Sequence, residues 1–228
     1  MLVIYERKFT MSRIITVKGV GKASVRPDQV EIRMTLEAKD TDYDKAMAIA
    51  ADQLNKLRTA LEVAGFGNDC LKTTEFDVRA VYASVKDRHQ NYTSVFDGYE
   101  CSHELKLTFD FDTANLSAAL AAIAKSSVNP KFYIDFTVKN PAAVNELVLK
   151  DATANARKKA EILCAASGVA LGDLISIDYN WGEVSFVSRT KYDMVKCYSV
   201  CEDAAPTMNI DPEDIDAGDS ATFIWEIK

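Results

Sequence analysis

Alternating apolar and polar residues run through much of this 228-residue sequence. A period of two is typical of strands that bury one face and expose the other. The pattern predicts strands at 15–19, 30–38, 76–82, 104–111, 132–138, 174–179 and 223–227. Because the polar stretch 86–93 joins the third strand to the fourth, we expect these two strands to form a long antiparallel hairpin.

Apolar residues at helical spacing predict three helices. The first covers about 41–64 and opens on a capping box in which a hydroxyl and a later carboxylate bind free amides. The second is short and begins at Asp112 or Thr113. The third runs from a cap at Asn140 to Gly168.

The order of these elements from 30 to 138 is strand, helix, strand, strand, helix, strand. It predicts an α+β fold with a βαββαβ-like core, in which an antiparallel sheet carries both helices on one face. The long third helix and the additional strands extend this core. The segment 181–219 shows no clean period, and we expect it to be a flexible loop or an interaction arm.

The charge balance excludes two classes of partner. The net charge of −7 leaves no basic surface of the kind that nucleic acids and anionic membranes require. The one basic cluster, 157–159, lies in the third helix and is interpreted as a solvated helix face. Hydrophobic residues at 48% and charged residues at 27% are average for a globular protein, so disorder is not expected.

The N-terminal residues predict no export signal. The apolar run 2–5 is too short for a signal peptide, and no later window approaches a membrane span. We treat 1–12 as an N-terminal extension, with Met1 or Met11 as the natural start. The five cysteines are an odd number, which favours reduced thiols and a cytoplasmic location. They are Cys70, Cys101, Cys164, Cys197 and Cys201.

The stretch 19–24 is superficially similar to a phosphate-binding loop. In that motif a glycine stands five residues before the Gly-Lys pair, and a serine or threonine follows the lysine. Here Thr16 and Ala23 occupy those positions, and the next element is a strand instead of a helix. Gly19 and Gly21 are therefore interpreted as a bulge or tight turn at which the first strand ends.

Two further motifs could carry chemistry. Cys197 and Cys201 have the spacing of a metal pair or redox couple, but the two histidines lie about a hundred residues away, and zinc needs four ligands. His103 shares the parity of the buried face of its strand, and no motif provides a nucleophile or carboxylate for it. Unreactive thiols and a satisfied histidine at the rim of the sheet are the better interpretations. His89 falls in a polar turn.

The carboxylates form no recognisable site. The pair Asp28 and Glu31 is ordinary in an acidic chain. The run 211–219, with Asp211, Glu213 and Asp214, does not match the spacing of a calcium loop. The sequence thus predicts no catalytic, cofactor-binding or metal-binding residue, and no cofactor.

Three blocks of sequence, in this order, resemble the SIMPL domain family. Residues 15–21 and 25–32 are similar to its opening "V-x-G-x-G … x-P-D-x-A-x-I" strand pair, although Gln29 replaces a small apolar residue. Residues 152–161 and 168–172 resemble its long helix and the turn that follows. Residues 210–215 and 223–227 resemble its closing strand. The resemblance covers 13–228, with two subdomains at about 13–140 and 141–228.

The resemblance implies a function that does not depend on catalysis. The family takes its name from a mammalian adaptor that binds a signalling kinase, and exported bacterial relatives resemble periplasmic immunogenic proteins linked to stress tolerance. Neither branch implies catalytic residues, and the resemblance also suggests homo-oligomers. The leading hypothesis is a non-enzymatic protein that binds copies of itself or another protein. The alternative is a small-ligand-binding protein or enzyme with a cleft near the 71–111 hairpin, using His103 and Glu104.

Overall fold

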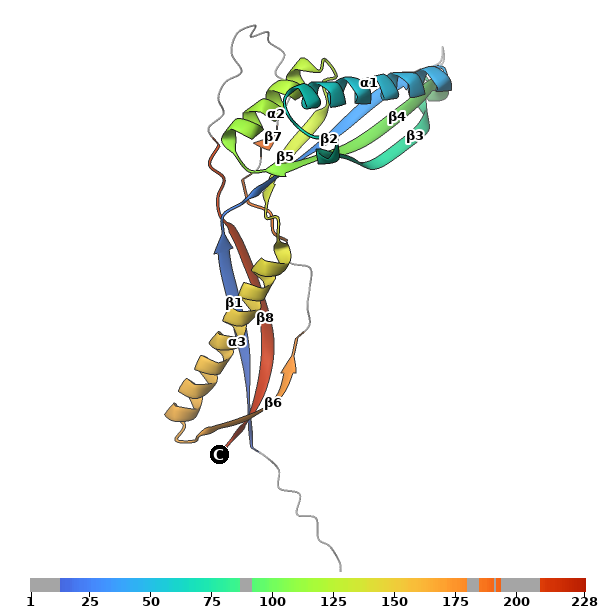
Figure 1. Ribbon diagram of the computed structural model, residues 1–228. Helices are drawn as coiled ribbons and strands as arrows, with labels where there is room; N and C mark the ends of the chain where they lie inside the picture. The colour runs from blue at the N-terminus through green and yellow to red at the C-terminus, as the bar shows by residue number, and fades with distance from the viewer. Residues whose placement is uncertain (1–12, 87–91, 180–184, 191, 194–209) are drawn as a thin grey trace, which may run out of the picture. The chain divides into compact units, whose positions relative to one another are not determined.

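The computed structural model describes residues 13–86, 92–179, 185–190, 192–193 and 210–228 (Figure 1). The helices are α1 (Tyr43–Val63), α2 (Thr113–Lys125) and α3 (Pro141–Ala166), with a 3-10 turn, η1, at Asn68–Cys70. The strands are β1 (Ile14–Val25), β2 (Gln29–Asp40), β3 (Leu71–Lys86), β4 (Tyr92–Asp110), β5 (Lys131–Thr137), β6 (Leu171–Asp178), β7 (Tyr192–Asp193) and β8 (Ile215–Ile227). Antiparallel sheets with helices between their strands confirm the predicted α+β class.

The chain divides into two compact units. Unit 1 holds the residues up to Val25 together with Asn140–Phe186 and Ile215–Lys228, and unit 2 holds Arg26–Lys139 and Val187–Asp214. Unit 1 joins both ends of the chain because β1 pairs with β8, and unit 2 includes later residues because β7 and Val187 pair with β5 and Thr137. The predicted subdomains, 13–140 and 141–228, stay a prediction.

Unit 2 contains the predicted βαββαβ-like core. Along the chain the core has the order β2, α1, β3, β4, α2, β5. Its strands and β7 form one sheet in the order β3-β4-β2-β5-β7, and α1 and α2 lie on the same face of this sheet (Figure 1). The alternation in β2 explains this layering: Val30, Ile32 and Met34 are buried toward the helices, whereas Arg33 lies on the open face.

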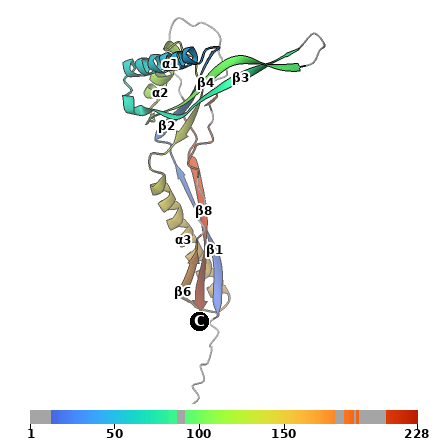
Figure 2. The ribbon, with the colours of Figure 1, turned by 90° about the vertical axis from the view of Figure 1, so that its right-hand side faces the viewer.

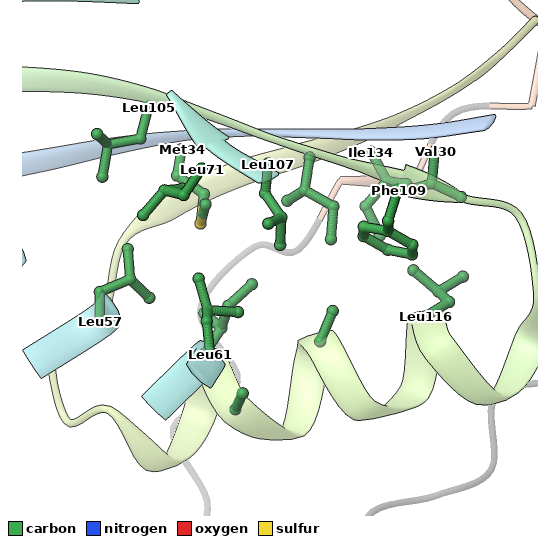
Figure 3. Close-up of a cluster of buried hydrophobic side chains, with 14 of the residues drawn as sticks. Val30, Met34, Leu57, Leu61, Leu71, Leu105, Leu107, Phe109, Leu116 and Ile134 are labelled. Carbon is green, nitrogen blue, oxygen red and sulfur yellow. The ribbon is translucent and has the colours of Figure 1, made fainter. Parts of the chain in front are cut away.

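Leucines from both helices fill the space beneath this sheet. Leu57 and Leu61 of α1 and Leu116 of α2 point toward the strands, where they meet Leu105 and Leu107 of β4 (Figure 3). All five side chains are buried. Burying an aliphatic side chain of this size stabilises the fold by about 1.5–3 kcal/mol, so the body of unit 2 needs no ligand to hold its shape.

The helix boundaries follow the predicted signals with one change. Asp42, and not Thr41, caps α1, because the Asp42 carboxylate accepts hydrogen bonds from N–H groups of the first turn. Asn140 caps α3 as predicted: its Oδ1 accepts a hydrogen bond from Ala143 N at 3.1 Å. Gly168 follows α3 in the left-handed conformation, with φ at +71°.

The prediction that the first strand ends at Gly19 and Gly21 is wrong. β1 continues to Val25 and pairs with β8 along its whole length. The two glycines are ordinary strand residues in unit 1, whose sheet has the order β1-β8-β6. Only glycine fits at these two positions because α3 lies directly on them.

Alanines on α3 complete this close approach. Ala152, Ala156 and Ala160 are fully buried against the sheet. A Cβ placed on Gly19 would lie 2.2 Å from Ala152 O, and a Cβ on Gly21 would lie 1.9 Å from Val148 O. Neither distance is physically possible, so the helix backbone and the strand backbone touch here without intervening side chains.

Strands lie within the segment 181–219, which was predicted to lack periodicity. β7 lies within it, and β8 begins at Ile215, well before the predicted strand at 223–227. Residues 180–184, 191 and 194–209 lie outside the described part of the chain, as does the extension 1–12. The prediction of a loop or interaction arm at 181–219 therefore concerns mostly residues that the structure does not describe.

The glycine contacts predict a strong effect of one methyl group. We expect Gly21→Ala, and to a similar degree Gly19→Ala, to lower the free energy of unfolding by roughly 1–3 kcal/mol, because α3 must move away from β1 to admit the Cβ. Urea denaturation followed by circular dichroism measures this loss. Gly67→Ala is the control, since a Cβ there meets nothing within 4 Å; equal stability of all three variants would contradict the prediction.

Candidate functional site

The edges of the two sheets are the first place to look for a binding surface. An edge strand presents backbone N–H and C=O groups that can pair with another strand. The unit 1 sheet ends in β1 and β6, and the unit 2 sheet ends in β3 and β7. These four edges differ in how far other residues of the chain cover them.

The β1 edge is closed by side chains of α3. Three residues spaced by four along this helix lie on one side of it and bond to the strand backbone. The contacts join Val20 N to Asn155 Oδ1 (3.2 Å), Lys22 N to Asp151 Oδ2 (2.9 Å) and Lys159 Nζ to Lys18 O (3.2 Å). Of the basic cluster 157–159, interpreted above as a solvated face, Lys159 thus also contacts the sheet. A strand arriving at β1 would have to displace all three side chains.

The edge beyond β5 is covered as well. β7 pairs with Tyr133 and Ile134, and Val187 bridges to Thr137. Ser188 N also donates a hydrogen bond to Phe136 O at 2.8 Å. The β6 edge has only eight residues, and register shifts interrupt its pairing with β8 up to Ser176, so it offers a short template for another strand.

β3 is the long open edge. It has 16 residues, and β4 is its sheet neighbour. β2 pairs with β4 only from Tyr99 onward, so residues 81–86 and 92–98 form a two-stranded ribbon that runs past the body of the sheet (Figure 2). We call this ribbon the arm. A two-stranded ribbon without a covering layer is marginally stable in water.

The arm is apolar on both faces. On the face that continues under α1, Tyr82 meets Phe96 edge to face, and the contacts extend through Tyr99 to Tyr43, with ring centroids 5.9, 5.3 and 5.5 Å apart. On the other face Val85 and Val95 are each about half exposed. Tyr82 is 62% exposed and Phe96 45%. Strands that are apolar on both faces are normally covered on both, so the arm is the candidate interaction surface.

His103 is a satisfied core residue at the base of the hairpin. It is 7% exposed, its Nε2 lies 2.9 Å from Thr73 Oγ1, and its ring meets Phe76 edge to face at 5.0 Å. Burial lowers the pKa of this imidazole, and the nearby Arg58 lowers it further. The neutral ring is therefore the form that the fold prefers.

His103 and Glu104 do not meet. Neighbouring residues in a strand point to opposite faces, and Glu104 lies on the open face opposite Glu75 of β3. The hollow beside the hairpin base, between Phe66 and Leu107, has a volume of about 10 Å³, room for one water molecule at most. Neither His103 nor Glu104 lines this hollow, so it does not bring the two residues of the alternative hypothesis together.

A larger groove lies between α1 and α2. Its volume is about 730 Å³, and alanines line much of it, with Lys56 and Lys125 at its rim. The groove contains neither His103 nor Glu104. Periodicity could not reveal it, because it is made by small side chains that leave space between two helices.

The remaining candidate residues have structural surroundings. The Asp28 carboxylate accepts a hydrogen bond from Lys139 N at 2.7 Å, and Glu31 on the open face pairs with Arg33 and Lys106. The acidic run 211–219 includes the first residues of β8, 215–219. Within the described ranges, no group of three or more His, Cys, Asp or Glu side chains is arranged to hold a metal ion.

The cysteines of the described residues, Cys70, Cys101 and Cys164, are free thiols. Burial raises the pKa of Cys101, which favours the unreactive thiol form. Cys197, Cys201 and His89 lie outside the described residues. No helix in the described part of the chain is long and apolar enough to cross a membrane.

Comparison with known proteins identifies relatives. A family described as "SIMPL: Protein of unknown function (DUF541)" matches residues 15–225. The "26 kDa periplasmic immunogenic protein" of Brucella abortus (strain S19) is 27% identical over 163 residues, and that of Brucella melitensis biotype 1 is 26% identical over 163 residues. Each match covers 72% of this chain and 65% of the relative, slightly less than two thirds of the relative's length.

Among solved structures, the regulatory subunit of aspartate kinase from Thermus flavus aligns over 93% of this chain and 90% of its own. The identity is 10% and the TM-score 0.20. A TM-score this low supports no statement about the present protein.

The prediction of a cytoplasmic location is wrong, since both Brucella relatives are named periplasmic proteins. It rested on an odd number of cysteines and on the short apolar run 2–5. A cysteine count indicates a compartment only if the thiols are accessible. Cys101 and Cys164 are buried, so they would stay unpaired in an oxidising compartment as well.

Removing the side chains that close the β1 edge should expose it. We expect the double variant Asp151→Ala/Asn155→Ala to scatter more light than the wild type at equal concentration, because Val20 N and Lys22 N lose their partners and become free to pair with other chains. Alanine is a good helix former, so α3 should persist. Glu161→Ala, an exposed change on the same helix, is the control; equal scattering by the double variant and this control would refute the effect.

The burial of His103 predicts how stability depends on pH. Because its pKa is lowered in the fold, the unfolded chain binds the proton first as the pH falls through about 6.5. The free energy of unfolding should therefore decrease from pH 7 to pH 5, and the decrease should be smaller in His103→Gln. Urea titrations at several pH values measure this slope. Thr73→Val keeps the histidine and should keep the slope; an unchanged slope in His103→Gln contradicts the assignment.

Proposed function

This chain belongs to the SIMPL family, whose members are described as proteins of unknown function, and from that premise we propose that it is a non-enzymatic protein that acts by binding copies of itself. The two Brucella relatives named periplasmic support the same compartment for this chain. The observation that carries the proposal is the arm, which is apolar on both faces and open along β3.

The energetics favour covering the arm. Burying the exposed part of a half-exposed aromatic or aliphatic side chain yields on the order of 1 kcal/mol. Tyr82, Phe96, Val85 and Val95 all offer such surface on one short ribbon. A second copy is the occupant that matches best, because it brings an equally apolar ribbon and an equally open edge, and each copy covers the other.

The catalytic alternative has less support. His103 and Glu104 point to opposite faces of the sheet, and the hollow between Phe66 and Leu107 is too small for a substrate and is lined by neither residue. A partner other than a second copy, and a role in stress tolerance, which the resemblance implies, stay predictions.

Polar substitutions on the arm should dissociate the assembly. We expect Tyr82→Ser/Phe96→Ser to reduce the weight-average mass in sedimentation equilibrium at tens of micromolar, because the aromatic cluster of the arm is lost. Tyr133→Ser is the matched control: Tyr133 is also a half-exposed strand tyrosine of unit 2, but it lies on β5.

Two results would refute the proposed self-association through the arm. One is a monomeric mass for the wild type at tens of micromolar. The other is an assembly whose mass falls equally in the arm variant and in Tyr133→Ser. Circular dichroism of each variant establishes that its secondary structure is retained.

A further inference from the structure

We propose that β3 pairs antiparallel with β3 of a second copy about a two-fold axis at Val78, so that the unit 2 sheets of two copies become one continuous sheet. The inference rests on the proposed self-association and specifies its contact. It names the strand, the direction and the register of pairing.

Symmetry restricts the possible registers. When two identical strands pair antiparallel about a two-fold axis, one residue lies opposite itself, and residues at equal distances on either side lie opposite each other. β3 runs from Leu71 to Lys86, so its midpoint falls between residues 78 and 79. Pairing about Val78 therefore overlaps most of the two strands. The pairing is regular over Glu75–Val81, and the register shift between Thr73 and Glu75 lies outside this stretch.

Charge selects the same register. Pairing about Val78 places Asp77 opposite Arg79 of the second copy, and Arg79 opposite Asp77 of the second copy. A register centred on Arg79 or on Asp77 would set like charges against each other, and one centred on Phe76 would set Asp77 against Glu75. Registers centred further along the arm leave Arg79 opposite an apolar residue. Opposite charges across a strand pair stabilise it, and like charges destabilise it.

The contact also places a positive charge beside a cluster of carboxylates on the open face. Glu75 lies directly opposite Glu104 within the sheet, next to Asp77. In the proposed register Arg79 of the second copy arrives opposite Asp77 and diagonal to Glu75. Arg79 already bonds Glu100 of its own chain at 2.5 Å, and a guanidinium has five donors, so it can bind a second carboxylate without giving up the first.

The apolar side chains of β3 gain lateral neighbours in this arrangement. Phe76 lies opposite Ala80 of the second copy, on the face that carries Tyr82 and Phe96. Because the strands run antiparallel, the arm of each copy extends along the base of β3 of the other copy. The side chains that are half exposed in one chain thereby gain neighbours, and the edge gains hydrogen-bond partners.

A cysteine at the axis tests the register. Cys101 lies opposite Val78 in the same sheet and would compete for a thiol introduced there, so the cysteine variants are made in a Cys101→Ala background. In Val78→Cys, the introduced thiol then lies directly opposite the same thiol of the second copy, within the range of a disulfide. Mild oxidation of the full-length protein should therefore yield a covalent dimer on a non-reducing gel, above the wild-type background from the native cysteines. Val81→Cys, at a similarly half-buried position three residues along, should yield only the background. Cross-linking of Val81→Cys instead of Val78→Cys would overturn the proposed register.

Charge reversal gives an independent test. In Asp77→Arg alone, position 77 of each copy places an arginine opposite Arg79 of the other copy, so two arginine pairs form across the axis. In Arg79→Asp alone, two aspartate pairs form in the same way. Each variant should dimerise about tenfold more weakly than the wild type, since every pair is counted twice across a two-fold axis. An equimolar mixture should regain wild-type dimerisation, because the arginine introduced in the first variant then faces the aspartate introduced in the second. Sedimentation velocity of the three samples measures this.

The outcomes separate this inference from the proposed function. A monomeric wild type overturns both. A wild type that associates, but whose single variants are unaffected or whose mixture fails to recover, overturns the register and leaves self-association standing. Loss of association in the two single variants, with recovery on mixing and with cross-linking of Val78→Cys, is the result expected if residue 77 faces residue 79 of the second copy.

Discussion

Unpaired backbone groups at the edge of a β-sheet are the constraint that shapes this protein. Every edge strand offers a row of N–H and C=O groups that water, a side chain or another strand must satisfy. In unit 1 a helix closes the β1 edge, and in unit 2 the segment around Val187 and β7 covers β5. β3 receives no such cover from the described residues, although it is the longest of the edge strands.

The closure of β1 depends on the contact between glycines and alanines. A carboxylate or amide side chain on α3 reaches the strand backbone only if the helix axis lies close to it. Gly19 and Gly21 remove the side chains that would keep Ala152 and its neighbours away. The same contact that buries the helix therefore brings Asp151 and Asn155 within 3.2 Å of the strand N–H groups. In unit 1 the packing of α3 on β1 and the closure of the β1 edge therefore depend on the same contact.

The sequence predicted those features whose cause is local. The alternation of Val30, Ile32 and Met34 fixes which face of β2 is buried, and Asn140 marks the start of α3 through its own side chain. The sequence could not show that the strand continues through Gly19 and Gly21. Glycine is needed there because α3, about 130 residues later in the chain, packs directly on the strand. The arm was missed for a related reason: alternation shows that residues such as Tyr82 lie on one face, but not whether another layer covers that face.

An open, apolar edge carries a risk of uncontrolled association, and the charges on β3 bear on that risk. Natural sheets commonly limit pairing at their edges with charged side chains. Three of the five charged residues of β3, Glu75, Asp77 and Arg79, lie near its middle and on one face, and the other two are lysines near its ends. In that position they do not prevent pairing, but they penalise most registers through like-charge contacts or unpaired charge. A strand built only to resist association would carry charges of one sign along its length. The mixed and central placement on β3 instead favours pairing in one register, which is the property expected of an interface rather than of a protected edge.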